Sequence, residues 1–369
     1  MKLRWSLTAL GMSVALGLTP ARAENEFLAP VVRVMADGGA VAQPPAVNCA
    51  DGGCQPAAGC GGTTCTVFTP QMIGNDLVTN VYAGNVFNNR TNNGYGLLAQ
   101  PQRGSFKISD NESPAPVDRW FLTYTYFNRV TAPALQFGVV QGPNGPGIGL
   151  VPQPVNTDVH RETFGFEKTF LNGDASIGIR MGVVQQDGDI QNDSFSDTTI
   201  IGKYYLIKRD NLLVSVGLAV TAPTGVQNPG AFGPAYRSVL FQPYSGFIWN
   251  RDRIYVHGFN STIFSTNDND PSFGTYDLGI GYRLYQVDDA KDRWLTYIIP
   301  TGELHANIPV TKEGWAGRTD FALPDNCTTT LGVHFGLCGK ANLTIGAGCP
   351  VSGPKLYDVS GIAQLNWRF

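Results

Sequence analysis

Four histidines are the residues of this chain best suited to acid–base chemistry, and each of them stands alone. None has a serine two positions away, the spacing that places both side chains on one face of a strand. Ser261 follows His257 by four positions, which is about 13 Å on a regular strand and too far for proton transfer. His160 stands beside Arg161 and Glu162, where a solvated loop residue is expected. The pattern therefore predicts no catalytic residues and no enzyme.

Seven cysteines offer thiols for metal binding or disulfides. Four of them stand in a Gly-rich stretch, namely Cys49, Cys54, Cys60 and Cys65. Paired zinc ligands are usually separated by roughly two to four residues, and no histidine is near, so two disulfides are expected instead, with three pairings open. Cys327 and Cys349 are candidates for a further disulfide across a hairpin whose turn holds Cys338, which leaves at least one thiol unpaired. We expect neither a metal nor a cofactor.

The N-terminus has the order of an export signal. A charged start, MKLR, is followed by an apolar stretch over residues 5–18 and then by Ala21, Arg22 and Ala23. This order predicts cleavage after Ala23 and makes residues 1–23 a signal peptide. A short amphipathic helix of the mature protein is the alternative. No cysteine directly follows the apolar stretch, so a lipid anchor is not indicated.

The composition favours many short strands. Of 369 residues 43% are hydrophobic and only 15% are charged, and there are 44 glycines. Outside the first twenty residues no run of eighteen apolar residues occurs, so membrane-spanning helices are not expected. The net charge of -3 provides no basic surface, and nucleic acid is therefore a poor partner.

Two regions follow the signal. Residues 24–118 are rich in Gly, Pro, Ala, Asn and Gln and predict a loosely structured arm or plug. From Arg119 onward, twelve segments alternate apolar and polar residues with period two, as half-buried strands do. Ile177 and Ile179, for example, share one face while Arg180 is on the other. We expect residues 119–369 to form an all-β domain of about twelve antiparallel strands.

The connections between these segments alternate between two classes. Tight turns are expected at residues 172–173, 209–210, 251–252, 288–292 and 339–341. Long connections are expected at residues 130–158, 185–197, 222–237, 265–274 and 309–326, with a short exception at 351–355. Such alternation is typical of a transmembrane up-and-down β-barrel, which has short periplasmic turns and long outer loops. A soluble barrel with a wet outer face is the alternative.

The last strand points to a particular membrane. Residues 361–369 alternate and end on Trp367, Arg368 and Phe369. This ending resembles the C-terminal strand of bacterial outer-membrane β-barrels, in which a final aromatic residue is recognised by the assembly machinery. The resemblance implies an outer-membrane location, contact with outer-membrane lipid and insertion by the barrel assembly machinery, with Trp367 and Phe369 as the assembly signal.

Three stretches carry a more specific resemblance. Residues 103–119, 164–180 and 343–355 are similar to porin-like proteins of planctomycete-type bacteria. The resemblance would cover residues 103–369 and implies a barrel akin to channels for fatty acids or aromatic compounds. It carries no catalytic or binding motif, and it leaves the role of the Cys-rich arm open.

A barrel in lipid requires apolar side chains outside and permits polar ones inside. The inward-facing, pore-lining candidates are Arg161, Glu167, Arg180, Lys203, Asp277, Arg283, Glu303, His305, His334, Asp358 and Arg368. Among them, Glu303 with His305, and Arg283 with Asp277, are candidates for a constriction. Charges of both signs predict no clear preference for anions or cations.

Three functions fit this reading. The first is a porin-like channel for passive diffusion of small solutes. Its pore would be narrow, because twelve strands lie between the barrels of about eight strands that side chains fill and those of about sixteen strands that hold an aqueous channel. The second is a plugged barrel, with residues 24–118 in the lumen, that passes small hydrophobic compounds. The third is a non-conducting structural or adhesive barrel. The sequence leaves the solute unnamed, and a homo-oligomer is compatible with the pattern.

Overall fold

The structure, a computed structural model, describes a defined part of the chain. The described residues are 55–56, 65–66, 70–74, 107–142, 145–188, 192–225, 238–266, 272–287, 293–310, 325–353, 355 and 357–369. The chain divides into two units, Met1–Val47 and Asn48–Phe369, and all described residues belong to the second. The predicted signal peptide, residues 1–23, and three of the four arm cysteines lie outside the described residues.

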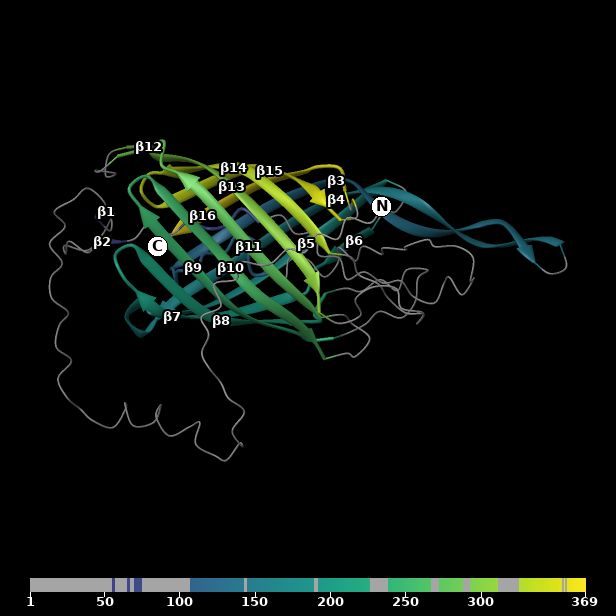
Figure 1. Cartoon of the computed structure of the whole chain (residues 1–369), viewed down its shortest axis with the longest axis horizontal. Helices are drawn as coiled ribbons and strands as arrows, with labels where there is room; N and C mark the ends of the chain where they lie inside the picture. Colours follow the sequence, from purple (N-terminus) through teal and green to yellow (C-terminus); the bar gives the residue numbers. More distant parts are fainter. Residues whose placement is uncertain are drawn as a thin grey trace, which may run out of the picture. The chain divides into compact units, whose positions relative to one another are not determined.

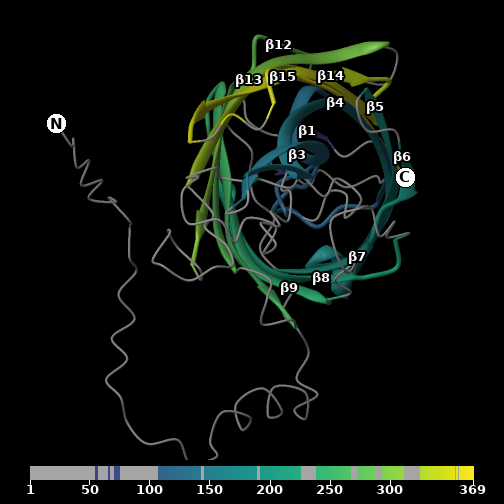
Figure 2. The same cartoon turned by 90° about the vertical axis from the view of Figure 1, so that its right-hand side faces the viewer.

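Twelve antiparallel strands close into a barrel (Figures 1 and 2). They are β3 (Arg119–Gly142), β4 (Gly145–Phe170), β5 (Ala175–Gly188), β7 (Thr198–Lys208), β8 (Leu212–Ala222), β9 (Leu240–Arg251), β10 (Ile254–Ser265), β11 (Phe273–Tyr282), β13 (Leu295–Pro309), β14 (Asn326–Leu337), β15 (Ala341–Ser352) and β16 (Ser360–Arg368). Each pairs with the next along the ring, and β16 closes it against β3, with Trp367 opposite Trp120. The predicted fold class is confirmed. Closure leaves no open sheet edge, as a backbone in lipid requires.

Short elements complete the described chain. β6 (Asn192–Phe195) pairs with β5, β12 (Tyr285–Gln286) pairs with β13, and β1 (Gln55–Pro56) pairs with β2 (Cys65–Thr66). A 3₁₀ turn, η3 (Leu171–Gly173), joins β4 to β5. In the described ranges no helix is long and apolar enough to cross a membrane.

Two predicted long connections are largely strand. Between residues 185 and 197, β5 continues to Gly188 and β6 pairs back onto it. Residues 130–158 are not an irregular loop, because β3 and β4 continue their pairing from Val130 opposite Thr157 out to Gly142 opposite Gly145. Figure 1 shows this extension as a two-stranded ribbon beyond the barrel. The prolines that favoured a loop, Pro133 and Pro154, lie opposite each other in the ladder. Proline is tolerated there because a two-stranded ribbon has only edge strands, whose outward N–H groups need no partner in the sheet.

Tight turns occur where the sequence predicts them, at one end of the barrel. They follow β4, β7, β9 and β14, and several turn residues have positive φ, including Asn172 at 56°, Asp252 at 50° and Gly339 at 67°. Short polar residues and glycine adopt this conformation with little strain, which is why they appear there. The predicted turn at 288–292 and the central parts of three long connections, 226–237, 267–271 and 311–324, lie outside the described residues.

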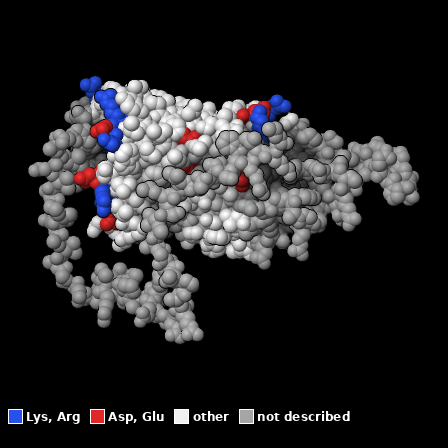
Figure 3. All heavy atoms as spheres, in the orientation of Figure 1, with Lys and Arg blue, Asp and Glu red and all other residues white. Residues whose placement is uncertain are grey.

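The outer face of the barrel is apolar. Ile177 is 53% exposed and Leu331 is 65% exposed, whereas Ser176 and Thr330, the residues directly before them, are buried. Figure 3 shows Lys and Arg gathered toward the two ends of one face, with a band made mostly of other residues between them. At the end with the tight turns, Trp120 stacks on Trp367 with ring centroids 6.0 Å apart, as interfacial aromatic girdles do. The face predicted to meet lipid therefore has the surface that lipid requires.

A charge on this face tests the assignment. Replacing Ile179, which lies on the outer face of β5, with Arg is expected to lower the free energy of unfolding by about 2–4 kcal/mol in lipid vesicles, because the guanidinium would face hydrocarbon. Phe195→Arg, on the short strand β6 at the other end of β5, is the control and should cost about 0–1 kcal/mol. Guanidinium titrations followed by tryptophan fluorescence measure both, and equal costs would contradict a membrane-facing surface.

Candidate functional site

The candidate site is the charged interior of the barrel. Eight of the eleven predicted pore-lining residues are buried, on strand faces that alternate with the exposed apolar face: Arg161, Glu167, Arg180, Lys203, Asp277, Glu303, His305 and His334. Period-two alternation places them there, since successive side chains of a strand point to opposite faces. Their role in lining a pore stays a prediction.

The other three candidates lie at the ends of the barrel. Arg283 directly follows β11 and donates to Asn250 Oδ1 at 2.6 Å and to the carbonyl of Asp252. Asp358 precedes β16 and pairs with Lys355 at 2.8 Å, and Arg368 is the last residue of β16. The proposed constriction between Arg283 and Asp277 is therefore absent, because the alternation that predicted it ends with the strand at Tyr282.

Four cations form a basic strip on one side of the interior. We define the basic strip as Arg119, Arg161, Arg180 and Lys203, which lie on the adjacent strands β3, β4, β5 and β7. Glu167, on β4, lies among them and pairs with Arg119 Nε at 3.0 Å and with Lys203 Nζ at 2.7 Å. Sequence reasoning missed Arg119 because it stands at the boundary between the arm and the first strand, although it shares the inward parity of Phe121 and Thr123.

Two pieces of the N-terminal arm lie inside the barrel. We call residues 70–74 and 107–115 the arm segments, and every residue in them is buried. They are joined by a backbone hydrogen bond from Met72 N–H to the carbonyl of Glu112, at 2.7 Å. The sequence signal for them was three charges, Lys107, Asp110 and Glu112, close together in the arm.

Carboxylates of the arm bind the basic strip. Asp110 Oδ2 lies 2.9 Å from Arg161 Nη2. Glu112 Oε2 lies 2.9 Å from Arg119 Nη2 and 2.9 Å from Lys203 Nζ. All of these side chains are almost fully buried, so each pair is a charge-assisted hydrogen bond away from bulk water.

Carbonyl groups of the arm accept further hydrogen bonds from the strip. Arg180 Nη2 donates to the carbonyl of Lys107 at 2.8 Å, and its Nη1 donates to that of Asp110 at 3.2 Å. Arg119 donates to the carbonyl of Asn111 at 2.7 Å, and Lys203 to that of Ser113 at 2.9 Å. Every member of the basic strip therefore has an acceptor from the arm.

An acidic cluster stands on another part of the wall. It consists of Asp277 on β11, Glu303 and His305 on β13, and His257 on β10. His305 donates Nδ1–H to Asp277 Oδ1 at 2.8 Å, and its Nε2 lies 3.4 Å from Glu303 Oε2. The structure thus brings together Glu303 and His305, as predicted for a constriction, and adds Asp277. His257 Nε2 lies 3.4 Å from Glu303 Oε1, a partner that the sequence did not reveal.

The arm supplies the opposite charge and two amides to this cluster. Lys107 Nζ lies 2.7 Å from Asp277 Oδ1. Both oxygens of Glu303 accept backbone N–H groups, from Ile73 at 2.8 Å and from Gly74 at 2.9 Å. Gly74 has φ +70° and a Cβ there would overlap Asp110, so glycine is required at this position.

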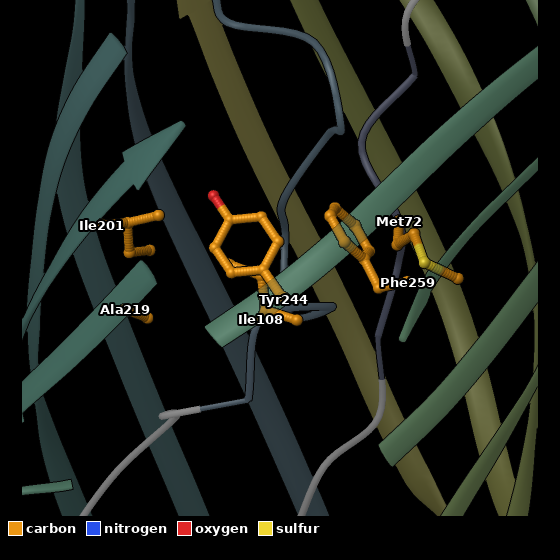
Figure 4. Close-up of a cluster of buried hydrophobic side chains, with 6 residues drawn as sticks. All are labelled: Met72, Ile108, Ile201, Ala219, Tyr244 and Phe259. Carbon is orange, nitrogen blue, oxygen red and sulfur yellow. The ribbon is translucent and has the colours of Figure 1, made fainter. Parts of the chain in front are cut away.

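Apolar contacts also hold the arm, in addition to its contacts with the basic strip and the acidic cluster. Met72 and Ile108 pack in one buried cluster with wall residues of β7 to β10 (Figure 4). These wall residues are Ile201, Ala219, Tyr244 and Phe259. Between them, the ionic and apolar contacts tie the arm segments to most of the circumference of the barrel.

The arm leaves the interior at the end with the tight turns. Asp118, just before β3, accepts hydrogen bonds from Lys168 Nζ at 2.6 Å and from the backbone and hydroxyl of Thr169. Partial burial raises the pKa of the Asp118 carboxyl, but the hydrogen bonds from Lys168 and Thr169 outweigh it and hold that pKa below its usual value. This anchor fixes where the arm passes into the first strand.

Ser261 and His257 have different partners among the described residues. Ser261 Oγ bonds to Gln242 Nε2 at 2.7 Å and to Thr275 at 2.6 Å, while His257 faces Glu303. No group of three or more His, Cys, Asp or Glu within the described ranges is arranged to hold a metal ion.

The predicted disulfide between Cys327 and Cys349 is not formed. Both are free thiols in the structure, as is Cys338 at the turn. The register explains this, because Cys349 lies opposite Thr329 and Cys327 opposite Ser352. Diagonal neighbours have side chains roughly 7–8 Å apart, whereas a disulfide needs Cβ atoms about 3.5–4.5 Å apart. The predicted disulfides of Cys49, Cys54, Cys60 and Cys65 involve side chains outside the described residues.

Comparison with known proteins gives similar folds at low identity. No protein-family model and no curated protein matches the chain. Among solved structures, an outer-membrane channel from Pseudomonas putida F1 is 12% identical, with a TM-score of 0.47 over 69% of this chain and 96% of that one. The KdgM porin is 11% identical, with a TM-score of 0.39 over 68% of this chain and 99% of its own. The NanC porin is 7% identical, with a TM-score of 0.40 over 68% and 98%.

These structurally similar proteins are outer-membrane channels and porins. None of them tests the resemblance to planctomycete-type proteins, which stays a prediction. Because the identities are 12% or less and the TM-scores 0.47 or less, function is argued below from this chain's own residues.

Proposed function

We propose that this chain is an outer-membrane channel that its own N-terminal arm keeps closed. The observation that carries the proposal is that the wall and the arm are complementary in charge. The arm's cation, Lys107, lies on the acidic cluster, and its anions, Asp110 and Glu112, lie on the basic strip. Of the alternatives derived from the sequence, a plugged barrel fits this arrangement better than a pore open to passive diffusion.

The chemistry of the contacts favours a plug that can leave. Replacing a buried ion pair with well-packed apolar residues is often neutral or stabilising, so charges are a poor choice for a permanent filling. A wall that becomes wet when the arm withdraws needs polar groups instead. The basic strip and the acidic cluster satisfy both states, since they pair with the arm when it is present and with water when it is absent.

The proposal keeps the division of the chain expected from its sequence. Residues 1–23 would direct export and be removed, residues 24–118 would form the arm or plug, and residues 119–369 would form the outer-membrane barrel. Trp367 and Phe369, at the end of the closing strand, would be read by the barrel assembly machinery. Which solute crosses, and whether it diffuses freely once the arm moves, follows from the tests below.

Weakening one arm contact tests the closed state. In Glu303→Gln, only one side-chain oxygen is left to accept the N–H groups of Ile73 and Gly74, and an NH₂ group faces the other donor. We expect the full-length variant to open in planar lipid bilayers at least about tenfold more often than the wild type, because a lost charge-assisted hydrogen bond is worth about 1.5–3 kcal/mol.

The matched control is Glu162→Gln, which neutralises an exposed carboxylate on the outer face of another wall strand, β4. It should leave the opening frequency unchanged. A wild type that conducts continuously, with no change in Glu303→Gln, would instead indicate an open diffusion pore. Absence of current from every variant would favour the structural or adhesive barrel, for which the long β3–β4 ribbon offers a binding element.

A further inference from the structure

We propose that the basic strip is a binding site for an organic solute with more than one carboxylate, and that the arm occupies this site as an internal mimic of that solute. This inference rests on the proposed function, because the site is available only after the arm withdraws. It names the class of solute, which neither the sequence nor the fold specifies.

The groups that the arm presents to the strip are all hydrogen-bond acceptors. Two are carboxylates, those of Asp110 and Glu112. Four are backbone carbonyls, those of Lys107, Asp110, Asn111 and Ser113. The arm thus resembles a ligand that carries more than one carboxylate among neutral oxygen atoms, as a polyhydroxylated dicarboxylate does.

The donors of the strip suit carboxylates. Three of its four members are arginines, whose planar guanidinium groups present several N–H donors in a fixed fork that matches a carboxylate. Arg119 shows how one guanidinium can hold several acceptors, because it contacts Glu112, Glu167 and a carbonyl of the arm at once. Because the strip crosses four adjacent strands about 4.8 Å apart, it can hold several anionic groups of one solute together.

The opposite charge elsewhere in the barrel directs the solute to this side. Asp277 and Glu303 would repel an anion, and the arm covers Asp277 with Lys107 and Glu303 with amide donors. Even with Glu167 among them, the four cations leave the strip net positive once the arm withdraws, which favours an anionic solute over a neutral or cationic one. The asymmetry of the wall therefore matches an anionic solute that follows strands β3 to β7.

The test uses the full chain with a neutralised arm, Asp110→Asn combined with Glu112→Gln, in planar bilayers. Two probes share one carbon skeleton: D-glucarate, with a carboxylate at each end, and neutral D-glucitol. We expect this variant to conduct, to select anions in a KCl gradient, and to be blocked by D-glucarate at a concentration at least about tenfold lower than by D-glucitol.

Removing one cation from the strip should then weaken the block. Arg180→Gln in the neutralised-arm background is expected to raise the blocking concentration of D-glucarate about tenfold or more, whereas Arg180→Lys, which retains the charge, should preserve anion selectivity. Lys208→Gln, an exposed cation at the β7–β8 turn paired with Asp174, is the control and should leave the block unchanged. A heat-shift gel verifies that each barrel is folded, and Lys203→Gln replaces Arg180→Gln should the latter not insert.

The outcomes separate this inference from the proposed function. A neutralised-arm variant that conducts but selects cations, or that D-glucarate and D-glucitol block alike, overturns the carboxylate site and leaves the plug intact. A wild type that already conducts as freely as the variant overturns the plug, and the inference falls with it.

Discussion

A chain that lacks residues 24–115 is expected to conduct continuously, with a time-averaged current on the order of 10²-fold or more above that of the full chain. The arm makes four buried ion pairs with the wall through Lys107, Asp110 and Glu112. Even three charge-assisted contacts at about 1.5 kcal/mol each would keep the open fraction of the full chain below about 10⁻³. Without the arm nothing holds that equilibrium closed.

The endpoints of the deletion follow from the contacts. A deletion that stopped at residue 102 would leave residues 107–115, and with them all four ion pairs, inside the barrel. Ending at 115 removes both arm segments and retains Asp118, which is bonded to Lys168 and Thr169 and fixes the start of the first strand. Single-channel recording after reconstitution measures the current.

The matched control is a deletion of residues 24–69. It removes about half of the predicted arm but neither arm segment, so the channel should stay closed. If this shorter deletion opened the channel as much as the longer one, closure would depend on residues 24–69 rather than on the buried ion pairs. If neither deletion changed the current, the arm would not be a plug.

The parts of the fold that could be predicted from sequence are those set by local rules. Alternation with period two fixed which face of each strand is apolar, and short turn-forming sequences such as Asn172-Gly173 fixed where hairpins close. Both signals act over a few residues, so twelve strands and their inward side chains could be derived without a structure. The same local rules say less at the ends of strands, where Arg283 and Asp358 lie just outside β11 and β16 and Arg368 is the last residue of β16.

The closing of the interior by the arm could not be derived in the same way. Glu303 and Ile73 are 230 residues apart, and no periodicity links a Gly- and Pro-rich stretch to a particular place on a distant wall. The sequence does contain the complementary charges: Lys107, Asp110 and Glu112 in the arm, and both acidic and basic residues on the strands. These charges identify their partners only once the strand order is known. The β3–β4 ribbon was missed for a related reason, since pairing partners override the loop tendency of Pro133 and Pro154.

The largest effect on stability is expected at Glu167, where the wall and the arm share two cations. Glu167→Ala should lower the free energy of unfolding of the full chain by about 3–5 kcal/mol, because Arg119 and Lys203 would keep their burial and lose a partner. The contact distances are 3.0 Å and 2.7 Å, and all three side chains are at most 2% exposed. Asp174→Ala is the control: its pair with Lys208 is about half exposed on both sides, and its loss should cost about 0–1 kcal/mol.

The same substitution in the chain lacking residues 24–115 discriminates between two roles of the arm. If the arm excludes water from this cluster, its removal lets water solvate Arg119 and Lys203, and Glu167→Ala should then cost roughly 1 kcal/mol or less. Guanidinium titrations in lipid vesicles, read from tryptophan fluorescence, give the four free energies of this cycle. If Glu167→Ala lowered the free energy of unfolding equally with and without residues 24–115, the wall itself would exclude water from these charges. The buried charges would then be a structural feature of the barrel rather than a binding site for a removable plug.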